Sequence, residues 1–231
     1  MEITFEQLDL SEILRYMGYK NQEKSQELTA LIENTVKEGL MVIKPRGIYQ
    51  TFPIERTEQG ILIPGTILEF TGEAIKKHLE NCHQVALLAA TLGPQMDQLL
   101  QVTSRFDITK SLILEATATE VIEKVCDQLQ AQIREEAQKN GFQITDRFSP
   151  GYGDLPLEIQ SNFLSVLDAT RKIGLTCTPN ATMIPSKSVT AIIGFYAGEK
   201  KETTAACTYC QLYENCQYRK DGNYCGHPKT S

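Results

Sequence analysis

The chain has 231 residues, 41% of them hydrophobic and 23% charged, which is typical of a globular protein with a core of its own. Its formal net charge of −6 argues against the basic face that binding to a nucleic-acid backbone requires. No apolar run approaches the roughly 20 residues that cross a bilayer, and the N-terminus lacks a signal-peptide pattern. We therefore expect a cytoplasmic protein whose seven cysteines do not form a disulfide framework.

The first part of the chain predicts two helices and then a group of short strands. Amphipathic patterns predict helices over residues 8–19 and 22–40, the second of them ending near Gly39. Over residues 41–70, β-branched and aromatic residues are interrupted by proline and glycine, which is typical of short strands joined by turns. Thr71 is expected to begin a further helix.

The rest of the chain predicts two buried strands separated by helices. Residues 83–93, HQVALLAATLG, are apolar almost throughout, which is typical of a strand buried on both faces. A short helix over about 94–104 precedes a long one over about 107–140. Residues 156–174 predict another helix, and residues 180–198 predict a turn followed by a last buried strand. The fold class expected from this order is α+β.

One acidic residue is unusual on the long predicted helix. At about 100° per residue, Ile108 and Ile122 lie on its apolar stripe, and Glu115, seven positions from each, lies in the middle of it. The stripe also contains Leu112, Val125, Leu129 and Ile133. Glu120 and Glu123 lie off the centre of the stripe, where solvated charges belong. A buried carboxylate needs a cation or hydrogen-bond donors, and a ligand, a structural arginine or a helix end that reaches solvent would each explain it.

The stretch at residues 147–156, RFSPGYGDLP, contains two glycines and two prolines and therefore predicts a loop. Glycines flank Tyr152, and glycine allows the backbone to approach a ligand closely. Arg147 can hold a carboxylate through two parallel hydrogen bonds, and Tyr152 offers an aromatic face to a cation or a ring. Together with an inward Glu115, the loop suits an amino-acid-like ligand. A rigid connection with an ordinary exposed arginine is the alternative, and the pattern by itself does not decide between them.

The loop motif, followed by a helix and by Met-Ile-Pro-Ser-Lys-Ser-Val at residues 183–189, resembles the activation (reactivation) domain of cobalamin-dependent methionine synthase. The resemblance covers roughly residues 100–196 well and the first hundred residues only weakly. It implies an antiparallel sheet packed with long helices, and a shallow groove that binds S-adenosylmethionine. It also implies docking on a cobalamin domain whose cobalt has reached the inactive cob(II) state.

The resemblance implies particular ligand-binding residues. The family's loop arginine and tyrosine correspond to Arg147 and Tyr152, and its small residue two positions after the arginine corresponds to Ser149. The family's long-helix glutamate, in a Glu-Ala-x-Ala context, corresponds to Glu115. The family's N-terminal aspartate and its late tyrosine segment have no convincing counterpart here. The N-terminal LDLSEILRYMGY resembles free-standing bacterial versions, which serve a methionine synthase that lacks its own activation domain.

A cysteine-rich segment follows the last predicted strand. Its four cysteines have the spacing C-x2-C-x5-C-x8-C and are Cys207, Cys210, Cys216 and Cys225. The segment is too poor in aliphatic residues to bury a core, and a bound metal is one way to fold it. Four thiolates fit zinc or an iron–sulfur cluster, and solvent-facing thiols in a disordered tail are the alternative. We predict a methionine synthase activation-like domain over residues 1–199 and a metal-binding tail over residues 200–231.

These observations predict a reactivation protein for a corrinoid methyltransferase, with methionine synthase and hence methionine biosynthesis as the first candidate. It would act by S-adenosylmethionine-dependent reductive methylation of cob(II)alamin, and the electron that this step needs slightly favours an iron–sulfur cluster in the tail. The expected partners are the cobalamin-binding domain of a separate protein and an electron donor, with neither nucleic acid nor membrane. The alternative is a metal-binding interaction module that docks on a corrinoid protein without methyl-transfer chemistry.

Overall fold

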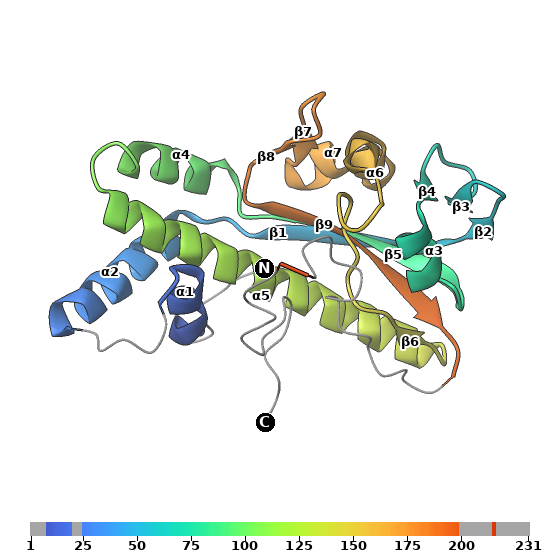
Figure 1. The fold of residues 1–231 in the computed structure, drawn as a ribbon, viewed down its shortest axis with the longest axis horizontal. Coiled ribbons are helices and arrows are strands. Elements are labelled where there is room, and N and C mark those ends of the chain that lie inside the picture. The colour runs from blue at the N-terminus through green and yellow to red at the C-terminus, as the bar shows by residue number, and fades with distance from the viewer. Residues whose placement is uncertain (1–7, 20–24, 199–213, 216–231) are drawn as a thin grey trace.

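The computed structural model describes residues 8–19, 25–198 and 214–215, and its centre is an antiparallel sheet with the strand order β1-β5-β9-β6 (Figure 1). The four strands are β1 (Arg46–Pro53), β5 (Cys82–Thr91), β6 (Gln143–Ile144) and β9 (Ser188–Tyr196). The central pair, β5 and β9, runs from Thr91 opposite Ser188 to Cys82 opposite Tyr196. Both buried strands and the α+β class are therefore confirmed.

The side chains of the central strands alternate between two faces of the sheet, and each face has its own apolar core. Ala86 and Leu88 belong to the first core, whereas Leu87 and Ala89 belong to the second. The helices of the first core are α1 (Leu10–Tyr16), α2 (Gln26–Val42), α4 (Pro94–Thr103) and α5 (Ile108–Lys139). The helices of the second core are α3 (Glu73–His78), α6 (Gln160–Leu167) and α7 (Ala169–Ile173). The sheet is thus covered on both sides (Figure 1).

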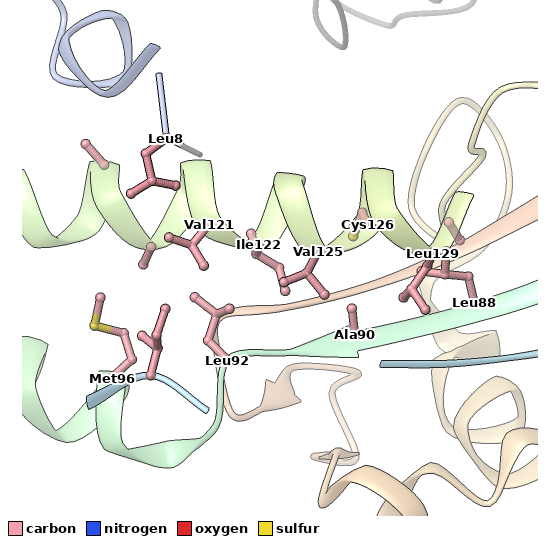
Figure 2. Close-up of a cluster of buried hydrophobic side chains, with 14 of the residues drawn as sticks. Leu8, Leu88, Ala90, Leu92, Met96, Val121, Ile122, Val125, Cys126 and Leu129 are labelled. Carbon is pink, nitrogen blue, oxygen red and sulfur yellow. The ribbon is translucent and has the colours of Figure 1, made fainter. Parts of the chain in front are cut away.

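The long helix α5 crosses the first face of the sheet and begins and ends close to the predicted positions. The Asp107 carboxylate accepts a hydrogen bond from the Lys110 backbone N–H at 2.9 Å, which caps the first turn. Gly141 follows the helix with a φ of +78°, as a helix-terminating glycine does. In Figure 2, Val121 and Val125 of α5 point toward the strand that carries Ala90.

Two helix boundaries differ from the predictions. The helix α2 does not end at Gly39 but continues to Val42. A Cβ at Gly39 would lie 3.2 Å from the Leu114 side chain, so the role of this glycine is to allow α2 to pack closely on α5. The helix predicted over residues 156–174 is divided into a 3-10 turn (Leu157–Ile159), α6 and α7. The division between α6 and α7 is at Asp168, whose φ of +54° lies outside the right-handed helical region.

The remaining strands are short. The predicted turn-rich region forms a second antiparallel sheet of β2 (Glu55–Arg56), β3 (Gly60–Leu62) and β4 (Glu69–Thr71). The helix expected to begin at Thr71 begins at Glu73. Two further short strands, β7 (Thr176–Cys177) and β8 (Met183–Ile184), pair with each other. Among the described residues, no helix is both long and apolar enough to span a membrane.

Candidate functional site

The predicted loop lies against β9 and forms a defined turn. The backbone N–H and C=O of Phe148 bond to the C=O and N–H of Ile192 at 2.9 and 2.7 Å, so the sheet holds the start of the loop. The Tyr152 N–H then donates to the Ser149 C=O at 3.0 Å across a turn whose third residue, Gly151, has a φ of +83°. Proline in second place and a positive φ in third place are the features of a type II turn.

The side chain of Arg147 contacts two acids of α5. Its Nη2 lies 2.7 Å from Glu123 Oε2, and its Nη1 lies 3.0 Å from Asp127 Oδ1. The side chain of Arg147 is only 15% exposed, whereas those of Glu123 and Asp127 are 41% and 43% exposed. The two acids are four positions apart and therefore share one face of the helix. Arg147 thus joins the loop to α5. In this charged cluster the two acids are exposed to solvent and the arginine is mostly covered.

The sequence reasoning missed both of these acids. The helical pattern places Glu123 on a solvated face, which agrees with its exposure of 41% but gives no indication of its partner. Asp127 has no distinguishing feature in the sequence. The only available signal was the spacing of the two acids, because one arginine can bridge carboxylates four positions apart on a helix.

The predicted inward position of Glu115 is wrong. Its side chain is 48% exposed and forms an ion pair with Lys187 Nζ, whereas the acid buried on α5 is Glu120, which is 3% exposed. The physical reason is that the first turns of α5 leave the apolar stripe uncovered, with Ile108 80% and Leu112 45% exposed. The role that the family resemblance implies for Glu115 as a ligand contact stays a prediction.

The structure brings together only some of the predicted site residues. Arg147, Ser149 and Tyr152 lie in one loop beside the middle of α5. Glu115 precedes Glu123 by eight positions, which corresponds to about 12 Å along a helix axis. Its ion pair with Lys187 is therefore separate from the Arg147 cluster.

The segment with the Met-Ile-Pro-Ser-Lys-Ser-Val motif connects the start of β9 to α4 and α5. The Asp97 carboxylate of α4 accepts hydrogen bonds from Ser186 N–H at 2.7 Å and from Ser186 Oγ at 2.8 Å. Ser188 Oγ donates to the Pro185 carbonyl at 2.7 Å. Lys187, between the two serines, makes the ion pair with Glu115. These contacts anchor the start of β9 to α4 and α5.

The first helix lies on the same side of α5 as the acids that meet Arg147. Burial raises the pKa of Tyr16, the nearby Arg15 guanidinium opposes this shift, and the charges of Glu123 and Glu120 add to the rise. Arg15 Cζ lies 4.3 Å from the centroid of the Tyr16 ring. Burial also raises the pKa of Glu120, and Lys124, at 3.4 Å, opposes this rise. The surroundings of the Arg147 cluster are therefore rich in acids.

The predicted metal ligands Cys207, Cys210, Cys216 and Cys225 lie outside the described residues, and so does the predicted boundary at residues 199 and 200. Within the part of the chain that the structure describes, no group of three or more His, Cys, Asp or Glu side chains is arranged to hold a metal ion. The metal centre of the tail therefore stays a prediction.

Neither a protein-family model nor a curated protein matches this chain. Among solved structures, the chain is similar to the crystal structure of the MetH reactivation domain bound to AdoHcy, with a TM-score of 0.64. The two are 16% identical, and the alignment covers 97% of this chain and 85% of that chain. The likeness confirms the fold that the sequence resemblance implied, a mixed α+β arrangement of an antiparallel sheet and helices.

Proposed function

We propose that this protein binds S-adenosylmethionine beside Arg147 and uses it to reactivate a cobalamin-dependent methyltransferase, with methionine synthase as the first candidate. The observation that carries the proposal is the position of Arg147. It lies next to a glycine-containing turn, is mostly buried, and meets two half-exposed acids. The fold around it is similar to that of the MetH reactivation domain, whose solved structure contains AdoHcy.

The groups around Arg147 fit the charges of S-adenosylmethionine. The ligand has a carboxylate, an ammonium group and a sulfonium group, so its net charge is +1. Arg147 with Glu123 and Asp127 has a formal charge of −1. A guanidinium has five N–H donors, and its two ion pairs here use two of them, so donors remain for a ligand carboxylate. Glu123 and Asp127 would meet the cationic groups of the ligand.

The other residues of the loop would complete the site. The ring of Tyr152 would lie against a cationic group or the adenine of the ligand. Ser149 and Tyr152 are the ends of the type II turn, which would bring main-chain donors and acceptors close to the ligand. Glu115 would take part only after release from Lys187, and we therefore expect it to contribute less than Glu123.

The proposed reaction has two parts. An external one-electron donor reduces cob(II)alamin of the partner protein to cob(I)alamin. The cobalt then attacks the methyl group of S-adenosylmethionine, the bond from methyl carbon to sulfur breaks, and methylcobalamin and AdoHcy are formed. The methyl transfer draws an unfavourable reduction forward. The role of this chain would be to hold the sulfonium group with its methyl toward the docked cobalamin domain.

The four cysteines of the tail would hold one metal centre in the proposed protein. An iron–sulfur cluster there would be a route for the electron, whereas zinc would leave only a docking role. Metal analysis and an absorption spectrum of anaerobically purified protein distinguish these cases. A protein with a tail metal that docks on a corrinoid partner without binding S-adenosylmethionine would be the interaction module instead.

Calorimetry with S-adenosylmethionine and AdoHcy is the direct test of the proposed ligand. We expect both to bind, with S-adenosylmethionine the tighter ligand because its extra positive charge matches the charge of the site. A second assay follows methylcobalamin formation by absorbance in a cob(II)-loaded partner with a reductant. A wild-type protein that binds neither ligand overturns the proposal. Binding without an increase in methylcobalamin would retain the site and reject the reactivation.

A further inference from the structure

We infer that α3 holds the loop at residues 146–154 in shape from both of its ends, and that His78 is a positioning residue for ligand binding by this loop. The identity of the ligand rests on the proposed function, whereas the clamping of the loop by α3 does not. No sequence motif indicated this role. It depends on contacts between residues about 70 to 80 positions apart in the chain.

His78, at the end of α3, holds the first part of the loop. Its Nε2 lies 3.1 Å from the Asp146 carbonyl, and because a carbonyl only accepts, the imidazole carries its proton on Nε2. Its ring centroid lies 5.0 Å from that of Phe148. Asp146 and Phe148 are the two neighbours of Arg147 in the chain. His78 therefore contacts the backbone on one side of Arg147 and the side chain on the other.

The same ring contacts continue to Tyr152. The Phe148 and Tyr152 ring centroids are 5.5 Å apart with an interplanar angle of 87°, an edge-to-face arrangement. Phe148 is buried and is bonded to β9 through its backbone. The rings of His78 and Tyr152 are thus connected through the ring of Phe148.

The start of α3 holds the other end of the loop. The Asp154 carboxylate accepts hydrogen bonds from the Glu73 N–H at 2.6 Å and from the Ala74 N–H at 3.0 Å. Gly72, which precedes them, has a φ of +119°, and a Cβ there would lie only 2.6 Å from Asp154 Oδ1. Glycine at this position therefore allows the loop to dock on α3.

These contacts fix the loop at both ends of the segment that contains Arg147 and Tyr152. The helix α3, with its own side chains in the second core, is a support for this loop that is itself anchored in the protein. Because binding to a preformed loop avoids the entropy cost of ordering it, release of either end is expected to weaken binding. His78 and Asp154 lie outside the turn at residues 149–152, and the role that we assign to them is to hold the loop rather than the ligand.

The test is a set of His78 variants with two measurements. His78→Phe keeps a ring and removes the donor, His78→Gln keeps a donor and removes the ring, and His78→Ala removes both. We expect AdoHcy to bind about tenfold more weakly to His78→Ala and about threefold more weakly to each of the other two. Hydrogen exchange of the bonded amides of Gly151, Tyr152 and Leu155 should become faster in His78→Ala, while the amides of β5 and β9 stay protected.

Two controls separate positioning from general stability. His83→Ala removes an exposed histidine at the start of β5 and should change neither measurement. Ile32→Ala opens the first core, on the other face of the sheet, and should lower the melting temperature without changing loop exchange or affinity. A further variant, Gly72→Ala, disturbs the contact between Asp154 and the start of α3. It should increase hydrogen exchange of the loop amides as His78→Ala does.

Three results would be decisive against the inference or the function. If the loop amides of His78→Ala exchange hydrogen as slowly as those of the wild type, the inference that α3 clamps the loop is overturned. An affinity loss in Ile32→Ala equal to that in His78→Ala shows that affinity follows stability and overturns the positioning role. A wild-type protein that binds neither AdoHcy nor S-adenosylmethionine rejects the proposed function, and the exchange data then decide the inference about α3 independently.

Discussion

Two basic residues reach α5 from the sheet, Arg147 from the loop and Lys187 from the segment before β9, and their surroundings differ. The two side chains are similarly buried, 15% and 20% exposed. Arg147 bridges two carboxylates, whereas Lys187 forms an ion pair with one carboxylate among the described residues, that of Glu115, which is 48% exposed. A planar guanidinium can bond two acids and retain donors for a third partner, which a single ammonium does less well.

The backbone segments next to Lys187 and Arg147 also differ. Near Lys187, Ser186 is bonded to Asp97 through both its N–H and its hydroxyl, so this segment satisfies its polar groups internally. Near Arg147, the turn has a glycine with a positive φ and an aromatic side chain at its end. The comparison teaches that Lys187 and its neighbours hold the start of β9 in place, whereas Arg147 lies beside a turn and two half-exposed acids and is the centre of the proposed ligand site. Because Glu115 is 48% exposed, solvent screens its ion pair with Lys187, which contributes at most about 1 kcal/mol to stability.

The largest effect is expected from substitution of Arg147. Arg147→Ala should weaken S-adenosylmethionine binding by about 10- to 100-fold, because a charge-assisted hydrogen bond contributes about 1.5–3 kcal/mol. Lys187→Ala is the matched control and should change affinity by less than about threefold, because its ion pair with Glu115 is separate from the Arg147 cluster. Calorimetry measures both. Equal effects of the two substitutions would remove the distinction between the two regions.

A smaller effect is expected from the acids that face them. Glu123→Gln should weaken S-adenosylmethionine binding by about fivefold and AdoHcy binding by less, because only the former has the sulfonium charge. Glu115→Gln should change either affinity by less than about twofold. Melting curves recorded beside the titrations show whether a loss of affinity reflects a loss of stability. The opposite ranking would return Glu115 to the ligand site, as the family resemblance implies.

Glu120, the buried acid of α5, should affect the stability of the protein and the dependence of that stability on pH. Burial raises the pKa of Glu120 above its ordinary value of 4.5, so the folded protein binds this proton more tightly than the unfolded chain. The stability contribution of the protonated group is then present below pH 4.5 and is lost as pH rises through the folded pKa. Glu120→Gln should therefore melt at a higher temperature than wild type at pH 7.

The pH series provides the control for this prediction. The advantage of Glu120→Gln should disappear below pH 4.5, where the carboxyl group becomes protonated in the unfolded chain as well as in the folded protein. A constant difference across the whole range would show that the effect comes from packing against α1 rather than from charge. A lower melting temperature at pH 7 would show that the Lys124 and Asp9 contacts outweigh the cost of burial.

The smallest effect on the fold is expected from removal of the tail. A chain truncated after Gly198 should stay folded and bind S-adenosylmethionine as the full chain does, because β9 ends at Tyr196 and both apolar cores form before it. It should fail to reactivate a cob(II) partner unless a strong reductant is added. The measurements are a melting curve, a titration and the methylcobalamin assay. An aggregated product would show that the tail belongs to the core, and full reactivation would remove the proposed role of the tail.

Much of the fold could be predicted because its signals are local. The apolar run at residues 83–93 and the capping residues Asp107 and Gly141 specify a buried strand and the ends of α5 through contacts only a few residues apart. The turn after Arg147 is specified in the same way, by a proline and a glycine whose allowed dihedral angles suit a type II turn. Such local signals are insufficient at Gly39, which looks like a helix end in the sequence but lies inside α2, where it packs on Leu114.

By itself, therefore, the sequence determined the long helix α5, the two buried strands and the loop that contains Arg147 and Tyr152. Only the tertiary structure decided which acid on α5 is buried, because burial depends on which part of an apolar stripe another element covers. It left Ile108 and Glu115 exposed and buried Glu120. The partners of Arg147 were likewise decided by folding, since an ion pair between residues 20 to 24 positions apart depends on the direction in which α5 and the loop meet.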